Sequence, residues 1–499
     1  MSKVTSSLVH TFMGRYAFIL INLASMMTYA RLLTPEEIGI HVIAITASAI
    51  IIELRLIGTG SYIIKLSSVT TKDIENVLFV TLGISLILGL SLYYSAEWLS
   101  NFYEVSGMVS VIEILVGTFL LTPFTAVSQS YLSRQFNFKV LATINVLSAL
   151  CSFIVTILLI ELGLSYLSLA FGVLAAQFFQ FLAHFIVKPE IVSWVPRPGN
   201  FKNILSFGGT LTIVTFINKA TESLPELALG KVIGPSASAL FSRGLGAVRF
   251  SNETVLGFVL PLVTPYFSEA KRTGGLTFDA YEKATSHVTI LIVPILMSLA
   301  VVPDLAITLL FGDQWLEASS ILSILCITFA LTSTTHFFKN LLIVEEKESF
   351  ILYVKLISFP IFIIFALTFG TINLLSMSFA FATATVMEAL GFYFILCRYM
   401  SFDLRRHLIN QSKSFLLGTI CLIVTYFSSS FFKLYHLPVI VETLILALVL
   451  STLWIVSIVL MKHEISKTIF TLLERFPYFA KKDFFIKLRQ YGIEAKPHE

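Results

Sequence analysis

Long apolar stretches separated by short polar segments run through most of the 499 residues of the chain. A helix that crosses a bilayer needs about 20 apolar residues, and fourteen stretches have roughly this length. They are residues 7–30, 38–54, 77–94, 109–131, 140–161, 166–187, 204–230, 236–265, 284–302, 318–338, 350–369, 373–397, 414–431 and 438–461. The pattern therefore predicts an all-α polytopic membrane protein with about fourteen transmembrane helices.

Prolines interrupt several of these stretches, among them Pro123 in the fourth and Pro294 in the ninth. A proline inside a helix removes one backbone hydrogen bond and commonly kinks the helix. Membrane helices tolerate this defect where a neighbour supplies a new partner for the freed backbone group. Both stretches therefore remain assigned to single helices, and each kink is either static or a hinge.

Lysine and arginine are unevenly distributed among the segments that connect the stretches. If the N-terminus is cytoplasmic, the six inner segments contain sixteen of them, and the seven outer segments contain only Arg31, Lys231 and Lys433. Cytoplasmic loops of membrane proteins carry such an excess. We therefore expect both termini in the cytoplasm, with residues 462–499 as a basic cytoplasmic tail.

The composition excludes several classes of protein. Hydrophobic residues make up 56% of the chain and charged residues 13%, whereas soluble proteins carry about 25% charged residues. A soluble enzyme, a disordered protein and a nucleic-acid-binding protein are thereby excluded. No phosphate-binding glycine loop, zinc motif or serine elbow is present, and the four cysteines lack metal-site or redox spacing. We expect no catalysis, no cofactor and no metal, and an ion gradient or the substrate gradient as the energy source.

An internal repeat relates residues 114–132 to residues 324–342 at a constant offset of 210, with eight of nineteen positions identical. The repeat includes a polar stripe. Its members are Thr118, Thr122, Thr125 and Gln129 in the first copy and Thr328, Thr332, Thr335 and Lys339 in the second. Residues 31–35 are also echoed by residues 231–235.

Because the repeated helices are six spans apart, both copies have the same orientation in the membrane. The repeat therefore predicts two pseudo-symmetric six-helix lobes, residues 1–200 and 201–410, followed by two extra C-terminal helices in residues 411–461. Parallel repeats of this kind are related by an axis along the membrane normal, and the substrate site lies between them.

Polar residues at helical spacing mark one face of several stretches, and such a face requires water or another polar helix. Three cations fall on these faces, Arg15, Lys219 and Arg249, and a fourth, Arg243, lies about 100° around its helix from Ser242. Arginine binds phosphate through paired hydrogen bonds, so we expect a hydrated chamber for an anionic cargo such as a phosphate-bearing lipid. The predicted chamber-lining polar residues are Asn22, Thr118, Thr122, Gln129, Thr328 and Thr332.

Acidic residues on the same helices leave two interpretations open. Lys219 could pair with Glu222 or Glu226, and Arg249 with Glu253, because intramembrane charges usually pair. Glu388 lies alone in the twelfth stretch. It either binds H⁺ or Na⁺ as a coupling ion or pairs with Lys355. Glu222 and Glu253 are likewise candidates for ion coupling or for pairing.

Five short motifs carry a family resemblance. They are residues 31–39 (RLLTPEEIG), 229–234 (LGKVIG), 239–243 (ALFSR), 259–268 (VLPLVTPYFS) and 310–315 (LFGDQW). In this order the motifs resemble those of polysaccharide exporters of the Wzx oligosaccharide-flippase type, in the multidrug/oligosaccharidyl-lipid/polysaccharide (MOP) exporter superfamily.

The resemblance implies a MATE-like fold and alternating access. It also implies a function: moving a polyprenyl-pyrophosphate-linked oligosaccharide repeat unit across the bacterial cytoplasmic (inner) membrane for O-antigen, capsule or exopolysaccharide synthesis. The implied partners are this lipid-linked glycan, the bilayer, a polysaccharide polymerase and a chain-length regulator, with no nucleic acid and a monomeric state. Two alternatives remain: a cation-coupled drug exporter of the same fold, and a membrane polysaccharide polymerase.

Overall fold

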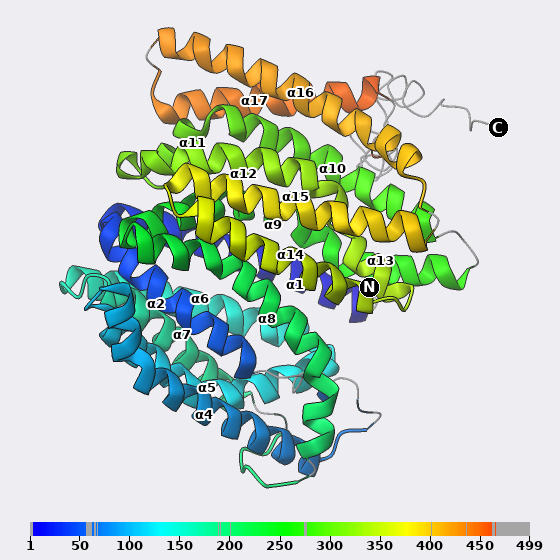
Figure 1. Cartoon of the computed structure of the whole chain (residues 1–499). Coiled ribbons are helices and arrows are strands. Elements are labelled where there is room, and N and C mark those ends of the chain that lie inside the picture. The colour runs from blue at the N-terminus through cyan, green and yellow to red at the C-terminus, as the bar shows by residue number, and fades with distance from the viewer. Residues whose placement is uncertain are drawn as a thin grey trace. The chain divides into compact units, whose positions relative to one another are not determined.

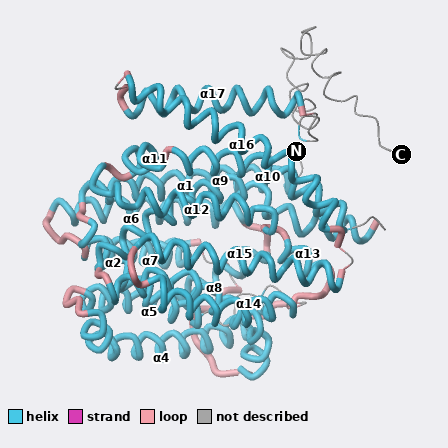
Figure 2. Tube along the Cα trace, turned by 45° about the horizontal axis from the view of Figure 1, so that its top comes forward, coloured by secondary structure: helices cyan, strands magenta, loops and turns pink. Residues whose placement is uncertain are grey.

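The computed structural model describes residues 3–55, 62–63, 66, 68–187, 189, 191–199, 201–273, 277–400, 402–435, 437–461 and 465. Within these ranges all regular secondary structure is helical and no strand occurs (Figure 2). The prediction of an all-α protein is confirmed. Apart from residue 465, the predicted tail 462–499 lies outside the described residues.

Each of the fourteen apolar stretches falls in helical segments (Figure 1). The first six correspond to α1 (Lys3–Leu32), α2 (Pro35–Arg55), α4 (Thr71–Tyr103), α5 (Met108–Arg134), α6 (Phe138–Glu161) and α7 (Leu167–Ile186). The next segments are α8 (Phe201–Val232), α9 (Pro235–Arg272), α10 (Thr277–Val301), α11 (Pro303–Leu310), η1 (Asp313–Ala318), α12 (Ser319–Thr332), η2 (Ser333–Thr335) and α13 (Phe338–Val344). The last are α14 (Ser349–Phe365), η3 (Ala366–Gly370), α15 (Leu374–Tyr399), α16 (Leu404–Leu434) and α17 (Val439–Leu460).

Eleven helical segments of the described chain are long and apolar enough to cross a membrane. The long helices α1, α8 and α9 are not among them, and these are the helices that carry the four predicted cations. The protein is a multi-pass membrane protein. The count of fourteen spans and the cytoplasmic position of the termini remain predictions.

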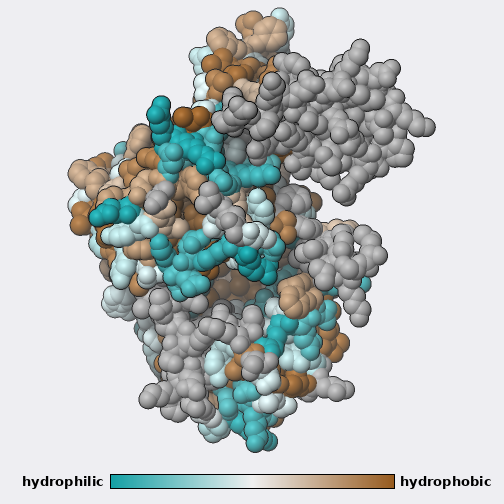
Figure 3. All heavy atoms as spheres, turned by 90° about the vertical axis from the view of Figure 1, so that its right-hand side faces the viewer, coloured by the Kyte–Doolittle hydropathy of each residue, from teal (hydrophilic) through white to brown (hydrophobic). Residues whose placement is uncertain are grey.

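Side chains on the outside of the helices fit this assignment. Many large apolar side chains are exposed, for example Ile87, Leu158, Ile357 and Phe394. Hydrophilic side chains gather instead on the face that Figure 3 shows. Exposed apolar helix flanks are expected where lipid replaces water as the solvent.

Contacts between residues divide the chain into two compact units. Unit 1 comprises Met1–Arg243, Phe311–Ala318 and Lys355–Ala384, and unit 2 comprises Gly244–Leu310, Ser319–Val354 and Thr385–Glu499. The predicted lobes 1–200 and 201–410 and the C-terminal pair 411–461 follow the sequence repeat rather than these contacts, and they remain predictions.

Each unit has its own packing. In unit 1, α1 packs on α6, α4 on α5, and α2 on α8, around buried residues such as Leu92, Ile112 and Phe119. In unit 2, α10 packs on α12 and α16, and α16 on α17. Ile290 of α10 and Cys421 of α16 are buried in a cluster that α10, α16 and α17 form.

Candidate functional site

The helices that carry the repeat have matching local structure. Thr122 Oγ1 donates to Thr118 O at 2.8 Å in α5, and Thr332 Oγ1 donates to Thr328 O at 2.9 Å in α12. These two bonds occupy the same positions at the offset of 210. The repeated polar pattern therefore produces the same hydrogen bonds in both halves of the chain.

The match extends beyond the repeated sequence to the ends of the helices. Phe136 and Glu346, again 210 residues apart, both have left-handed backbones, with φ of 56° and 59°. After each, the next N–H turns back into the helix: Asn137 N donates to Leu132 O and Lys347 N donates to Leu342 O. This is the 6→1 bond of a Schellman helix end. The two halves thus share backbone geometry where their sequences differ.

The threonine stripe is buried. Thr118, Thr122, Thr328 and Thr332 are only 4–8% exposed, and each hydroxyl donates to a carbonyl of its own helix. A threonine satisfied in this way can pack against a neighbouring helix without water. This placement argues against the chamber-lining role predicted for all four.

Two other predicted lining residues are exposed. Gln129 is exposed on α5. Asn22 is exposed on α1, where its Nδ2 donates to Phe18 O at 2.8 Å. Both side chains are accessible to a polar ligand.

Arg15 and Lys219 are the predicted cations that stay available. Arg15 is exposed on α1 and Lys219 is half-buried on α8, both in unit 1. The alternative that Lys219 pairs with Glu222 or Glu226 stays a prediction. Glu226 accepts a hydrogen bond of 2.7 Å from Thr46 Oγ1, which joins α8 to α2.

Arg243 is enclosed rather than open to a chamber. Its Cζ lies 5.3 Å from the ring centroid of Trp315 and 5.8 Å from that of Phe311. Its Nε is buried and has no hydrogen-bond partner among the described atoms. Its charge also interacts with that of Glu226. The predicted cargo-binding role does not fit this enclosure, which depends on a distant loop that helical spacing cannot reveal.

The remaining predicted residues lie in unit 2. Arg249 is half-buried on α9, and Glu253 is exposed one turn further on. Glu388 forms an ion pair with Lys339, with 3.8 Å between Oε1 and Nζ. This ion pair supports the pairing interpretation of Glu388, with Lys339 as a partner that was not predicted.

An ion pair at the end of α8 was also not foreseen. Lys231 Nζ lies 2.8 Å from Glu104 Oε1 and 5.2 Å from the centroid of the Phe102 ring. The hydrogen bond from Lys231 holds the pKa of the exposed Glu104 carboxyl below its usual value. The pair ties the turn after α4 to the end of α8.

Sequence reasoning missed a buried polar network in unit 2. His407 Nδ1 contacts Glu282 Oε1, and Glu282 Oε2 accepts a bond of 3.0 Å from Asn410 Nδ2. On the other side, His407 Nε2 lies 3.1 Å from the hydroxyl of Tyr393, which lies 2.7 Å from that of Thr334. The network links α10, α15, α16 and η2. Glu282 and His407 are far apart in the sequence, and no spacing signal connects them.

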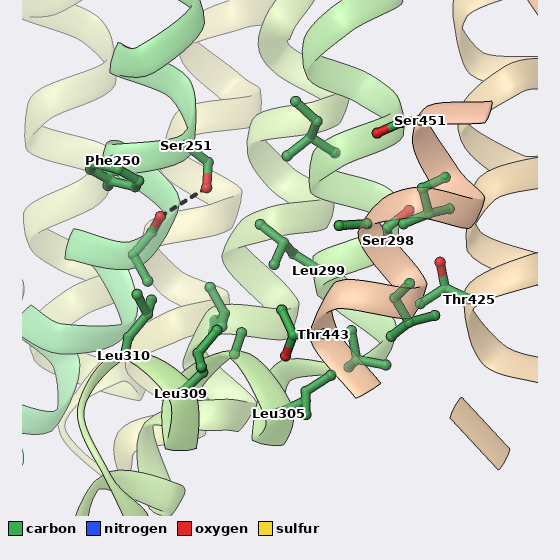
Figure 4. Close-up of a pocket in the computed structure, with 18 residues that line it drawn as sticks. Phe250, Ser251, Ser298, Leu299, Leu305, Leu309, Leu310, Thr425, Thr443 and Ser451 are labelled. Carbon is green, nitrogen blue, oxygen red and sulfur yellow. Dashed lines mark hydrogen bonds between the residues drawn. The ribbon is translucent and has the colours of Figure 1, made fainter. Parts of the chain in front are cut away.

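A mostly apolar cavity of about 410 Å³ lies in unit 2 between α9, α10, α11 and the C-terminal helices α16 and α17 (Figure 4). Leu299, Leu309 and Phe250 line it, with Ser298 and Thr443 as scattered hydroxyls. Ser251, at its edge, donates to the carbonyl of its own helix at 3.1 Å. The cavity suits a hydrocarbon chain better than a polar group.

Three curated proteins resemble the chain. The teichuronic acid biosynthesis protein TuaB of Bacillus subtilis (strain 168) is 22% identical over 283 residues, which are 54% of this chain and 56% of TuaB. The succinoglycan biosynthesis transport protein ExoT of Rhizobium meliloti (strain 1021) is 24% identical over 306 residues, 60% of each chain. The lipopolysaccharide biosynthesis protein WzxC of Escherichia coli (strain K12) is 19% identical over 425 residues, 81% of this chain and 83% of WzxC. The chain thus spans little more than half of TuaB and ExoT.

Solved structures share the fold. The lipid II flippase MurJ, in an inward closed conformation, matches with a TM-score of 0.73 at 14% identity over 90% of this chain and 99% of the MurJ chain. An inward-facing MATE family multidrug resistance transporter of the MOP superfamily matches with a TM-score of 0.61 at 16% identity, over 82% and 95% of the two chains. The MATE-like fold implied by the resemblance is confirmed.

The five motifs between residues 31 and 315 lie within the part of the chain that matches a family model. Residues 28–320 match the model of a polysaccharide biosynthesis protein family. Since this match covers more than half of the 499 residues, the chain belongs to the polysaccharide biosynthesis protein family, as its resemblance to polysaccharide exporters indicated.

Proposed function

We propose that this protein moves a polyprenyl-pyrophosphate-linked oligosaccharide repeat unit across the bacterial cytoplasmic membrane by alternating access, for the synthesis of a surface polysaccharide. Three features support the proposal: membership of the family, accessible cations on α1 and α8, which the sequence predicts to be membrane helices, and an apolar cavity of about 410 Å³. After transport, the repeat unit serves a polysaccharide polymerase and a chain-length regulator.

The observation that carries the proposal is the accessibility of two cations, Arg15 and Lys219. Inserting a cation into the membrane costs about 2.5–3.5 kcal/mol even on translocon scales, and such residues normally pair. Arg15 is exposed and Lys219 is half-buried, so both are accessible to an external anion that would compensate their charge. A pyrophosphate fits this requirement, because Arg15 can donate two parallel hydrogen bonds to it and Lys219 can add a point charge.

The test is export of polysaccharide by cells that carry a single variant of the gene. Each charge-assisted hydrogen bond contributes about 1.5–3 kcal/mol, so we expect Arg15→Ala and Lys219→Ala to lower export roughly 10- to 100-fold. Arg15→Lys should restore part of it. Lys139→Ala, on an exposed lysine of α6, is the matched control and should leave export unchanged.

The level of each variant in the membrane and the lipid-linked repeat unit retained in the cell are measured alongside export. Normal export by both alanine variants would refute the proposed cargo site. Normal export together with a new sensitivity to cationic drugs would instead favour a drug exporter of the same fold.

Energy coupling is the second part of the proposal, and it assigns H⁺ or Na⁺ coupling to Glu388. The motivation is that Glu388 is 19% exposed and its partner Lys339 lies 3.8 Å away, so an ion could compete for the carboxylate. We expect Glu388→Gln to lose the dependence of transport on the ion gradient. Transport by this variant with unchanged pH and Na⁺ dependence would exclude a direct role.

A further inference from the structure

The segment Phe311–Ala318 belongs by its contacts to unit 1, although the helices on either side of it, α11 and α12, belong to unit 2. The segment begins beside Gly312, whose φ of +98° is strained for other residues. It continues as the short 3₁₀ helix η1. The segment thus belongs to a different unit from the two helices that it connects.

Trp315 anchors this segment on the end of α1. Its side chain is fully buried, and its Nε1 donates to Ala30 O at 2.8 Å. Gln314 Nε2 donates to the same carbonyl and, at 3.2 Å, to Leu33 O. The last carbonyls of a helix have no donor within the helix, so the segment supplies the C-terminal cap of α1.

Arg243 provides a second anchor. Its guanidinium lies against the rings of Trp315 and Phe311, at 5.3 and 5.8 Å. The boundary between the two units falls directly after Arg243, within α9. The segment is therefore held by hydrogen bonds and cation–π contacts, each of which water can replace at modest cost.

On the predicted topology, the end of α1, the start of α9 and the segment itself all lie on the outer side of the membrane. We propose that Phe311–Ala318 is an outer latch: Trp315, seated between Ala30 and Arg243, keeps the transporter closed to the outside and must leave this seat for it to open. The proposal rests on the proposed transport function for its role, and on the contacts above for its residues.

The first test follows the thiol of Ala30→Cys in purified protein whose native cysteines have been replaced. Ala30 is fully buried, so a maleimide reaches this position only when the latch is open. Trp315→Phe keeps an aromatic ring and removes the donor to Ala30 O, so we expect labelling to become roughly two- to tenfold faster. The matched control is Trp98→Phe, because Trp98 is 64% exposed, and it should leave the rate unchanged.

The second test locks the latch. A Cβ atom placed at Gly312 would lie 4.0 Å from Arg31 Cγ, so Arg31→Cys and Asp313→Cys lie within reach of a short cleavable thiol cross-linker. We expect cross-linking to abolish transport and cleavage to restore it. The control pair, Glu37→Cys with Ser165→Cys, joins residues that contact each other within the N-terminal half and should not affect transport.

The outcomes separate the latch from the proposed function. Equal labelling rates for Trp315→Phe and Trp98→Phe, or full transport by the cross-linked protein, would overturn the latch whatever the cargo is. Faster labelling of Trp315→Phe supports the latch without any cargo, and it would stand even if no lipid-linked glycan were transported.

Discussion

The two copies of the internal repeat, residues 114–132 and 324–342, differ in whether their helix is continuous. In the first copy, α5 passes through Pro123 as one helix. In the second copy, the equivalent position at the offset of 210 is Ser333, and here the helix breaks into η2 before continuing as α13. The copy with the proline is continuous, and the copy without it is broken.

A neighbouring helix explains the continuity of α5. Pro123 has no N–H to donate to Phe119 O, and this carbonyl instead accepts a bond of 2.6 Å from Ser85 Oγ of α4. Gly89 allows the close approach of α4, since a Cβ there would lie 3.1 Å from Phe119 Cβ. A side chain of a neighbouring helix thus supplies the hydrogen bond that the proline cannot make, as membrane helices require.

The break in the second copy has a local cause and a similar repair. Four hydroxyl residues in succession, from Thr332 to Thr335, all donate to backbone carbonyls of their own segment. Such bonds compete with the helical ladder. Thr334 O, which a continuous helix would pair with an N–H four residues on, accepts a bond of 2.5 Å from the hydroxyl of Tyr281 of α10.

A third case supports the same rule. Pro294 leaves Ile290 O in α10 without its helical donor, and Trp454 Nε1 of α17 donates to it at 2.9 Å. In each case a side chain on another helix satisfies the freed carbonyl. Donors on neighbouring helices therefore help to decide where a membrane helix stays continuous.

The largest expected effect distinguishes the polar surroundings of the two copies. Beside the second copy, His407 of α16 bonds to buried Glu282, whereas beside the first copy His184 of α7 bonds to Ser128, at 3.1 Å. Removing one partner of a buried hydrogen bond to an acidic side chain costs up to about 3 kcal/mol. We expect His407→Leu to lower the free energy of unfolding in detergent by about 3 kcal/mol.

The matched control is His184→Leu, which loses one neutral hydrogen bond and should cost about 1 kcal/mol. Unfolding titrations with a denaturing detergent measure both variants. Equal losses for the two variants would show that the Glu282–His407 pair adds nothing beyond a neutral bond.

The intermediate effect concerns the hydrogen bond that the Tyr281 hydroxyl donates to Thr334 O, where the helix of the second copy breaks. Tyr281→Phe keeps the fully buried ring and removes the donor to Thr334 O. The loss should be about 1.5 kcal/mol, near the upper limit of hydrogen bonds measured between membrane helices. Tyr353→Phe, on an exposed tyrosine of α14, is the control and should be neutral. Should Tyr281→Phe also be neutral, another donor would have to replace the hydroxyl.

Much of this architecture could be predicted from the sequence, because hydropathy depends on local composition. The positions of the helices follow from hydropathy directly, and the offset of the repeat follows from the identical residues in its two copies. The repeat also indicated that Thr122 and Thr332 are equivalent, and the structure gives them the same bond.

The rest depends on contacts between distant residues. The sequence assigned Arg15 and Arg243 the same cargo-binding role, but the rings of Trp315 and Phe311 lie against Arg243. Spacing likewise identified the threonine stripe as polar, although a threonine that bonds to its own helix can be buried like an apolar residue. The partner of Phe119 O also could not be found, because nothing in the sequence pairs Ser85 with Pro123.

The smallest expected effect tests whether the hydroxyl of Ser85 compensates for the N–H that Pro123 lacks. Ser85→Ala leaves Phe119 O buried without its donor, and it should cost about 1 kcal/mol in the free energy of unfolding. In a Pro123→Ala background the restored N–H can donate to Phe119 O, so the same Ser85→Ala change should cost close to nothing. A double-mutant cycle measures this difference as a coupling energy of about 1 kcal/mol. If the two changes proved additive, Phe119 O would not connect them, and the continuity of α5 would require another explanation.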